Sequence, residues 1–474
     1  MYEDTSTKRE SHATTDIVAP VPVLLLAYSP SDSEDTRDRW AIDGELTVGR
    51  KRPAKLTVDD EYLSKPHFRI VPDGEAVFLD DMGSTNGTFI NGMPLVGRQK
   101  LQDADIIRAG RSIFIFHTDG EPLLEPCPPD IHSIGGRFHV APLLKKIRRF
   151  SGPHLHVLLT GPTGSGKELA AHALAKISNR ELVVHNAARL RSDSAAEAAL
   201  FGVGKKVFTD VEESTGLIEL ANGKALFLDE AHALSLSVQR MLLRVMEDWR
   251  LTKIGEHNSK EVDVKFVMAS NLSLEHYGMA QDLLGRLRVI EIRSLKERVA
   301  DIPGIFRYVL GSQLTKLGLD ANAVMKYVIA DFFECMCLDG FEGSNIRGLK
   351  KIADDIVFEL ASGESPEKTV KAIFKQRYKE SVVFSRALKS SQKQKQKSAA
   401  PAANGTDFSM KDLMMKFRLD ATTLGLIKDT YYSQKGIVTD IVERLREDHG
   451  IRTSHRRVKN IIDAMGLPRL KRQR

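Results

Sequence analysis

One stretch of the sequence has the glycines, the lysine and the flanking apolar run that can enclose phosphate groups. It reads HVLLTGPTGSGKELAAHALA, in which an apolar run precedes Gly161, and Gly166 and Lys167 open an alanine-rich helical pattern. Glycines let backbone N–H groups curl around phosphates, the helix N-terminus adds a positive dipole, and the lysine reaches the β- and γ-phosphates. We therefore predict that this loop binds a nucleotide through Gly161, Pro162, Thr163, Gly164, Ser165, Gly166, Lys167 and Glu168.

Two further apolar runs end in polar side chains suited to nucleotide hydrolysis. KALFLDEAHAL contains Asp229 and Glu230, and VKFVMASN ends in Asn271. The aspartate can hold Mg²⁺ through water, the glutamate can polarise the attacking water, and the asparagine can orient that water. A strand that simply ends in solvated acids is the alternative, but the phosphate loop about 60 residues upstream disfavours it. We expect ATP and Mg²⁺ as cofactors, with Asp229 as the metal-binding residue.

Positive charge is concentrated at the C-terminal end of the chain. The whole sequence carries a net charge of +6, whereas residues 452–474 alone contain eight Lys/Arg and one acid, a net charge of +7. Two helical patterns with apolar faces meet near HGIRTS, and such a pair with a basic outer face predicts DNA binding. A helical hairpin with a solvated basic face is the alternative. The expected DNA-binding residues are Ser454, His455, Arg456, Arg457, Lys459 and Asn460.

The bulk composition describes a globular chain of several domains. Its 474 residues suggest about three domains, and 42% hydrophobic with 28% charged residues is ordinary for a soluble protein. The sequence contains no apolar run near the ~20 residues that a membrane helix needs, and its polar N-terminus is not a secretory signal. Three cysteines without a paired pattern favour reduced thiols. We expect a cytoplasmic protein with no membrane contact.

The pattern of apolar residues divides the chain into three blocks. Short alternating runs over 22–117 predict a β-sandwich, and strands alternating with longer helical patterns over 131–380 predict an α/β domain followed by helices. A proline-rich joint at 121–130 separates them, and a low-complexity tether at 389–407 precedes a small all-helical domain at 408–474. The expected fold class is therefore multidomain: β-sandwich, α/β nucleotide-binding domain with a helical lid, and a helix-turn-helix-like domain.

The middle block resembles the AAA+ domain of bacterial enhancer-binding proteins, the activators of sigma-54 RNA polymerase. The resemblance covers 131–375 and is carried, in family order, by the loop ending in Lys-Glu and by HNAA, LFG, GLIELANGKALFLDE, LLRVMED, DVKFVMASN, SLKERVADIP and FEGSNIRGLKKI. It implies that Asn186 restrains Glu230 until ATP is sensed, and that Arg347 faces the nucleotide from the lid. It also explains Glu168, which stands where other phosphate loops carry a hydroxyl.

The same resemblance implies a homo-oligomeric ring in which an arginine completes the neighbour's active site. Family members carry two arginines here, whereas this chain reads MAQDLLGRL, with Ala280 at the first position and Arg286 at the second. Arg286 as a plain surface residue is the alternative. The family's sigma-contacting loop, GAFTGA, corresponds to KVFTDV: Phe208 and Thr209 are kept, and both glycines and both alanines are replaced.

The N-terminal block resembles a forkhead-associated (FHA) domain, which binds phosphothreonine peptides. LTVGR, SKPHF and DDMGSTNGTFING carry the resemblance. It implies that Arg50, Ser64 and Lys65 contact the phosphate, that Asn86 beside Thr85 binds the peptide backbone, and that His67 braces the loop. A cationic fork with hydroxyl and amide donors suits a dianionic phosphate. A GSTNGT hairpin can also be only a turn.

These parts together predict a DNA-binding, ATP-dependent transcriptional regulator that resembles sigma-54 activators and is controlled by phosphothreonine recognition. Its expected partners are DNA, sigma-54 RNA polymerase, a phosphothreonine-containing protein and further copies of itself. Two alternatives remain open at this point. One is a sigma-54-independent DNA-binding regulator with an altered contact loop, and the other is a phospho-dependent scaffold with weak ATPase activity.

Overall fold

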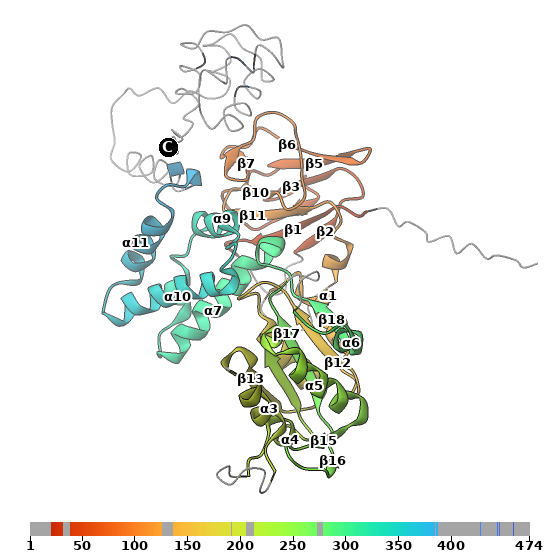
Figure 1. Cartoon of the computed structure of the whole chain (residues 1–474). Helices are drawn as coiled ribbons and strands as arrows, with labels where there is room; N and C mark the ends of the chain where they lie inside the picture. Colours follow the sequence, from red (N-terminus) through yellow and green to blue (C-terminus); the bar gives the residue numbers. More distant parts are fainter. Residues whose placement is uncertain are drawn as a thin grey trace, which may run out of the picture.

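The computed structural model describes two folded bodies and a helical lid (Figure 1). The described residues are 20–31, 38–125, 136–190, 192–204, 213–272, 278–383 and 385–386, with isolated positions at 427, 443, 445 and 458. The predicted C-terminal domain at 408–474 therefore lies outside the described residues apart from those positions. Among the described residues, no helix is both long and apolar enough to cross a membrane.

The N-terminal body is a two-sheet sandwich, as the alternating sequence pattern predicts. One sheet has the strand order β2-β1-β11-β10-β7-β8 and the other β4-β3-β5-β6-β9. Leu24, Leu26, Phe114 and Phe116 point into the space between the sheets and form its core. The strands are β1 (Val23–Tyr28), β2 (Arg39–Ala41), β3 (Leu46–Gly49), β4 (Leu56–Thr57), β5 (Phe68–Asp73), β6 (Ala76–Asp81), β7 (Thr88–Ile90), β8 (Met93–Pro94), β9 (Gln99–Lys100), β10 (Ile106–Ala109) and β11 (Ser112–His117).

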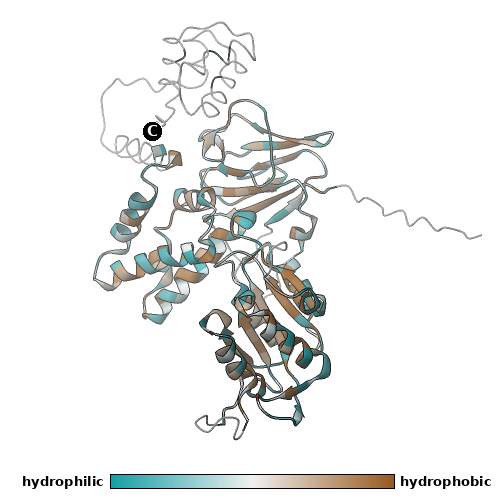
Figure 2. Cartoon of the chain, in the orientation of Figure 1, coloured by the Kyte–Doolittle hydropathy of each residue, from teal (hydrophilic) through white to brown (hydrophobic). Residues whose placement is uncertain are grey.

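The second body is a parallel five-stranded sheet in the order β13-β14-β17-β12-β18, covered by helices. Its strands are almost continuously apolar, as expected for a parallel sheet buried on both faces (Figure 2). This α/β body contains α1 (Val140–Arg149), β12 (His156–Thr160), α2 (Lys167–Ile177), β13 (Leu182–Asn186), α3 (Asp193–Phe201), α4 (Leu217–Leu220), β14 (Ala225–Asp229), α5 (Leu236–Asp248), the hairpin β15 (Arg250–Thr252) and β16 (Ser259–Glu261), β17 (Lys265–Ser270), α6 (Gln281–Arg286) and β18 (Leu287–Glu291).

A helical lid, residues 295–386, follows the α/β body. It begins with a 3-10 segment, η5 (Lys296–Asp301), and its longest helices, α7 and α10, pack side by side. Its helices are α7 (Ile302–Lys316), α8 (Ala321–Met325), α9 (Ala330–Asp339), α10 (Asn345–Ala361) and α11 (Pro366–Tyr378).

The lid and the sandwich share one hydrophobic core. Along β1, Val23, Leu25 and Ala27 point away from the sandwich interior and pack in the same cluster as Phe306 and Phe333 of the lid. This explains why every residue of β1 (VLLLAY) and β11 (SIFIFH) is buried, and why β1 and the centre of β11 are apolar without alternation. The sequence pattern of a one-sided sandwich would have polar residues there.

The connection between the two bodies is anchored at the start of the lid. The fully buried carboxylate of Asp301 accepts hydrogen bonds from the backbone N–H groups of Arg137 and Phe138, both at 2.7 Å, and of His139 at 3.3 Å. The imidazole Nδ1 of His139 lies 3.0 Å from the same carboxylate. On the sandwich side, Arg39 donates to the carbonyl oxygen of Arg137. Residues 136–139 are therefore held from both sides.

Candidate functional site

The phosphate loop joins β12 to α2 and takes a shape that requires glycine. Gly161 has φ +143°, and a Cβ there would lie 2.3 Å from the carbonyl oxygen of Ile292. Gly164 has φ +75°, and a Cβ there would lie 2.8 Å from the carbonyl oxygen of Ser344 in the lid. Side chains at these positions would collide with backbone and force an unfavourable conformation. The glycines of the motif therefore fit the loop closely between the sheet edge and the lid.

Lys167 lies at the start of α2 and is 9% exposed. Its Nζ donates to the carbonyl oxygens of Gly161 and Pro162, at 2.8 and 3.1 Å. Burial lowers the pKa of Lys167, an effect opposed by the nearby carboxylates of Asp229 and Glu230. An ammonium group that is partly desolvated and directed at its own loop is ready to exchange these carbonyls for phosphate oxygens.

A cleft of about 230 Å³ brings the predicted residues together. Its walls come from the phosphate loop and the start of α2, the ends of β14 and β17, and the first two turns of α10. Three basic side chains, three carboxylates and an amide line it. The lining residues are Thr163, Gly164, Gly166, Lys167, Glu168, Leu169, Asp229, Glu230, Asn271, Ile346, Arg347 and Lys350. Cations for phosphate oxygens and carboxylates for Mg²⁺ are thus present in one place, so the residues fit a magnesium–triphosphate group.

The acidic pair sits at the carboxyl end of β14, where a parallel sheet exposes its functional side chains. Glu230 has φ 52°, an uncommon left-handed conformation for a residue other than glycine. Its backbone N–H donates to the carboxylate of Asp229 at 3.0 Å. Asn271, just beyond β17, donates from Nδ2 to the hydroxyl of Thr163 at 3.2 Å. The amide therefore already touches the phosphate loop from the neighbouring strand.

Asn186 ends β13 and pairs in register with Asp229, so it lies at the same edge of the sheet as the acidic pair. Its side-chain oxygen accepts a hydrogen bond from the N–H of Ala188 at 2.9 Å and caps a short 3-10 turn. The cleft lining does not include it. The predicted restraint of Glu230 by Asn186 therefore stays a prediction.

The lid binds the phosphate loop through residues that the sequence reasoning missed. Asn345 is 1% exposed and has φ 49°. Its Nδ2 donates to the carbonyl of Thr163 at 3.0 Å, and its side-chain oxygen accepts from the N–H of Leu295 at 2.7 Å. The N–H of Ile346 donates to the carbonyl of Gly164, and Arg298 donates to that of Ser165 at 2.6 Å. The one available signal was the position of Asn345 two residues before Arg347.

The loops at one end of the sandwich bring the predicted phosphate-binding residues together. The hydroxyl of Ser64 accepts from the N–H of Thr85 at 3.1 Å, and the N–H of Arg50 donates to the carbonyl of Ser64 at 2.9 Å. Asn86 donates from Nδ2 to the carbonyl of Tyr62 at 2.8 Å. Arg50 keeps its Nε buried and without a hydrogen-bond partner. Two loops far apart in sequence thus form one polar surface.

His67 holds these two loops to each other. Its Nδ1 accepts from the N–H of Ser64 at 3.0 Å, and its Nε2 lies 3.2 Å from the carbonyl oxygen of Gly87. Burial lowers the pKa of His67, so the neutral ring with its proton on Nε2 suits both contacts. Lys65 follows Ser64 on the same loop, and its carbonyl oxygen lies against Gly49.

Comparison with known families identifies the two domains that contain these sites. Residues 134–293 match the family model described as the sigma-54 interaction domain, and residues 46–110 match the FHA domain. The chain carries an FHA domain and a sigma-54 interaction domain. The resemblances that the sequence motifs carry are therefore confirmed for both domains, as is the predicted order of a β-rich domain followed by an α/β domain.

Several transcription regulators are similar to the chain. NtrC, a DNA-binding transcriptional regulator from Proteus hauseri, is 31% identical over 248 residues, covering 49% of this chain and 51% of NtrC. The anaerobic nitric oxide reductase transcription regulator NorR of Salmonella newport is 31% identical over 284 residues, 58% and 52% of the two chains. The chain thus spans about half the length of these curated relatives. The crystal structure of NtrX from Brucella abortus is 19% identical, with a TM-score of 0.41 over 70% of this chain and 69% of NtrX.

Arg286, the expected trans-acting arginine of the sigma-54 interaction domain, lies outside its own chain's cleft. It ends α6, its side chain is 59% exposed, and its Nη2 lies 2.6 Å from the carboxylate of Glu247. Ala280, at the position of the first family arginine, immediately precedes the same helix, and its N–H donates to the side-chain oxygen of Gln239. The guanidinium of Arg286 is therefore exposed to solvent at the end of this helix, where it pairs with the carboxylate of Glu247.

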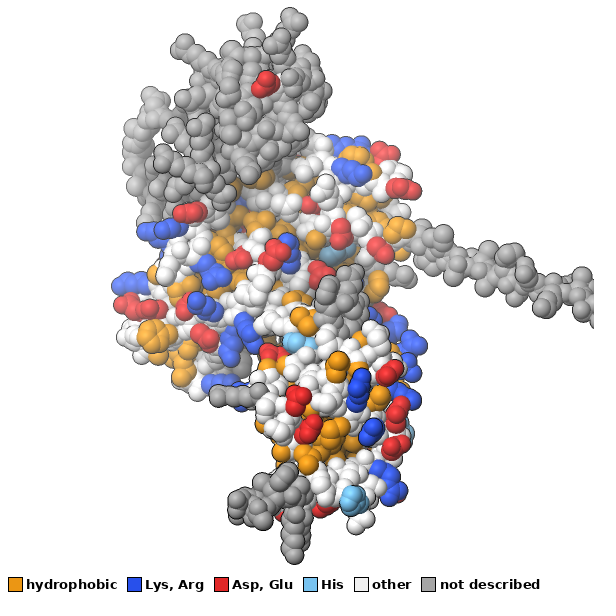
Figure 3. Space-filling model, in the orientation of Figure 1, with side chains coloured by type: hydrophobic (Ala, Val, Ile, Leu, Met, Phe, Trp, Pro, Cys, Tyr) orange, Lys and Arg blue, Asp and Glu red, His pale blue; other side chains and the backbone are white. Residues whose placement is uncertain are grey.

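Two predicted binding regions lie outside the described residues. These are the sigma-contacting loop with Phe208 and Thr209, and the predicted DNA-binding residues 454–457, 459 and 460. On the described part of the face seen in Figure 3, basic and acidic side chains are interspersed. The concentration of positive charge that predicts DNA binding thus belongs to the C-terminal sequence.

Proposed function

We propose that this protein is an ATP-dependent, DNA-binding regulator of sigma-54 RNA polymerase, controlled by recognition of phosphothreonine. The observation that carries the proposal is the cleft between the sigma-54 interaction domain and its lid. There the phosphate loop, Asp229, Glu230, Asn271 and Arg347 lie around one space. The charge arrangement fits a magnesium-bound triphosphate.

The charged and amide side chains that act on the nucleotide have separate tasks in this proposal. Lys167 and Arg347 bind phosphate oxygens, and Asp229 would hold Mg²⁺, which would supply positive charge to those oxygens. Glu230 orients the attacking water and accepts its proton, while Asn271 fixes the position of that water. Arg286 completes the site of a neighbouring subunit, where it stabilises charge that builds on the transferred phosphate. Hydrolysis therefore requires a ring.

The FHA domain is the reader of the input signal. Arg50 and Lys65 supply positive charge, Ser64 supplies a hydroxyl, and Asn86 binds the backbone of the phosphothreonine peptide beside Thr85. The unpartnered Nε of Arg50 supports this assignment, since a buried guanidinium donor normally has an acceptor. A phosphate dianion provides such acceptors.

The function is tested by ATPase and open-complex assays with purified sigma-54 polymerase. We expect the native protein to hydrolyse ATP and to open a sigma-54 promoter. Lys167→Ala removes the phosphate-binding ammonium and should abolish both activities, whereas Thr209→Ala should retain ATPase activity and lose promoter opening. A native protein that opens no sigma-54 promoter contradicts the proposal.

A second candidate function is favoured by the sequence of the contact loop. Lys206 and Asp210 replace the two glycines of the family's loop, and glycine is the residue that permits positive φ and tight turns. A regulator with ATP turnover but without sigma-54 activity would fit that change. ATP hydrolysis without promoter opening supports this candidate, and absence of turnover at concentrations where rings form supports a phospho-dependent scaffold.

A further inference from the structure

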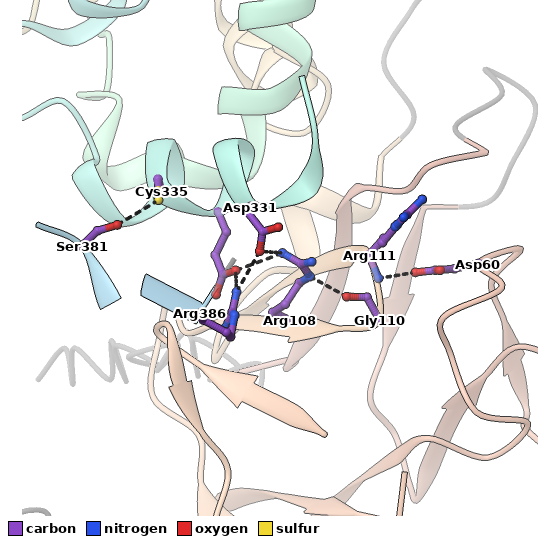
Figure 4. Close-up of polar contacts among 9 residues, drawn as sticks. Asp60, Arg108, Gly110, Arg111, Asp331, Cys335, Ser381 and Arg386 are labelled. Atoms are coloured by element: carbon purple, nitrogen blue, oxygen red, sulfur yellow. Dashed lines mark hydrogen bonds and ion pairs between the residues drawn. The ribbon is translucent and has the colours of Figure 1, made fainter. Parts of the chain in front are cut away.

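The FHA domain is packed against the lid of the ATPase across a buried, charged seam (Figure 4). Arg108 of β10 donates from Nη1 to Glu334 at 3.0 Å and to Asp331 at 3.3 Å, both on lid helix α9. Arg386, just past α11, pairs with the same two carboxylates. The side chain of Glu334 is fully buried, and that of Arg108 is 8% exposed. Two carboxylates and two guanidiniums thus balance their charges inside the seam.

Such a cluster fixes how the two domains sit together. A buried guanidinium that loses its carboxylates costs several kcal/mol, so α9 cannot slide along the FHA sheet without a new partner for Arg108. The apolar core shared by β1, β11 and the lid belongs to the same interface. Arg386 also lies over the ring of Phe89 in β7, 4.1 Å from its centroid. The seam therefore has both the packing and the directional contacts of a permanent interface.

One end of the seam is bonded to the phosphopeptide loops. Arg108 donates from Nε to the carbonyl of Gly110 at 2.7 Å, and the next N–H, that of Arg111, donates to Asp60 at 2.6 Å. The same carboxylate of Asp60 accepts from the N–H of Tyr62 at 2.9 Å. The carbonyl of Tyr62 in turn accepts from Asn86, a predicted peptide-binding residue. Hydrogen bonds, joined through the peptide unit between Gly110 and Arg111 and through the backbone of Tyr62, thus connect the peptide-binding loops to Arg108.

The other end of the seam leads to the phosphate loop. Helix α9 has ten residues, which span about 15 Å. Its N-terminal half carries Asp331 and Glu334, and Asn345 and Ile346, which bond to the phosphate loop, follow shortly after its C-terminus. A helix of this length moves as a rigid rod. A displacement at the FHA seam therefore reaches the backbone that surrounds the nucleotide phosphates.

We propose that the FHA domain is a fixed part of the ATPase lid and that α9 couples phosphopeptide binding to nucleotide binding with positive sign. The proposal rests on the two binding functions proposed above. Peptide binding orders the loops that hold Asp60 and Arg108, and this stabilises the lid in the position where it contacts the phosphate loop. In that position Arg347 and Lys350 line the nucleotide cleft. A nucleotide that meets an already ordered lid loses less conformational entropy on binding.

The test measures both affinities on the full-length protein. The probes are ATPγS and a phosphothreonine nonapeptide selected from a degenerate library, with its unphosphorylated form as control. We expect saturating phosphopeptide to tighten ATPγS binding by about fivefold or more, in the range typical of allosteric coupling. ATPγS should tighten peptide binding by the same factor, because coupling is reciprocal.

Variants of the seam separate coupling from binding. Arg108→Met leaves Glu334 paired with Arg386, so it should keep each affinity within about twofold and abolish the mutual effect. Glu334→Gln, which keeps the side-chain shape, should do the same and serves if Arg108→Met does not fold. The matched control is Arg98→Met, because Arg98 makes an exposed ion pair with Asp73 elsewhere on the FHA domain. It should leave the coupling unchanged.

Each of the other possible outcomes refutes one part of the proposal. If both ligands bind and neither changes the affinity of the other, or if the effect is negative, the coupling is refuted while both binding functions stand. Coupling that survives in Arg108→Met and Glu334→Gln refutes the route through α9. If no phosphothreonine peptide binds, the reader function itself fails, and the coupling fails with it.

Discussion

Asp301 offers the sharpest test of how the linker, the lid and the ATPase core are joined. Its carboxylate is fully buried and accepts four hydrogen bonds, three from backbone N–H groups of residues 137–139 and one from the His139 ring. Although burial opposes the charge, interactions led by His139 lower the pKa of Asp301, so the group is ionised at neutral pH. The substitution Asp301→Ala removes every one of these acceptor contacts.

The expected loss follows from the donors left behind. An unsatisfied buried donor costs about 1–3 kcal/mol, and the N–H groups of Phe138 and His139 lie in the buried part of this contact. Losing two to three such partners should lower the free energy of unfolding by about 3–5 kcal/mol, the range seen when a buried charge network is broken.

Urea unfolding followed by tryptophan fluorescence measures this loss, since Trp40 reports on the FHA domain and Trp249 on the α/β body. The control is Asp355→Ala, which removes an exposed carboxylate on α10 and should change stability by less than about 0.5 kcal/mol. A loss below about 1 kcal/mol for Asp301→Ala would refute the role given to this carboxylate.

Three further predictions concern single residues. Lys167→Ala should weaken ATPγS binding by about 100-fold or more, because it removes the cation at the β- and γ-phosphates; calorimetry that finds less than about tenfold contradicts this. Gly49→Ala should weaken phosphopeptide binding at least about tenfold in fluorescence anisotropy, because the new Cβ would lie 1.7 Å from the carbonyl of Lys65, whereas Gly44→Ala, with nothing within 4 Å, should bind normally. Burial, aided by nearby positive charge, lowers the pKa of His156 from 6.5 to about 4. The unfolded chain therefore binds a proton first as the pH falls, and about 3 kcal/mol of stability should be lost between pH 6.5 and about 4. His156→Asn should show less of this loss in unfolding curves measured across that range, and equal pH dependence in both proteins would contradict the assignment.

The nucleotide cleft could be predicted from sequence because its parts are local patterns. A phosphate loop needs a strand, glycines at fixed spacing and a helix, and all of these are contiguous around Lys167. The acids of β14 and the amide Asn271 follow strands of a parallel sheet, whose carboxyl ends meet at one edge. The contact of Asn345 with the phosphate loop could not be predicted in this way, since it forms only when the lid packs against that loop.

The docking of the FHA domain onto the lid could not be predicted, because its contacts join residues far apart in sequence. Arg108 and Glu334 are separated by 226 positions, and neither stands in a recognisable motif. One signal was present: β1 and the centre of β11 lack the alternating polar residues of a solvated face. That pattern indicates a covered sheet but does not identify the cover.

The central claim is that ATP is hydrolysed at sites shared between subunits, and a subunit-mixing assay tests it most directly. Glu230→Gln removes the residue that activates water and keeps Arg286, whereas Arg286→Ala keeps Glu230 and lacks the arginine. Each variant alone should be inactive. In a one-to-one mixture, about one interface in four joins an intact Glu230 to an intact Arg286, so we expect about a quarter of the native ATPase rate. A mixture as inactive as either variant alone would contradict the account.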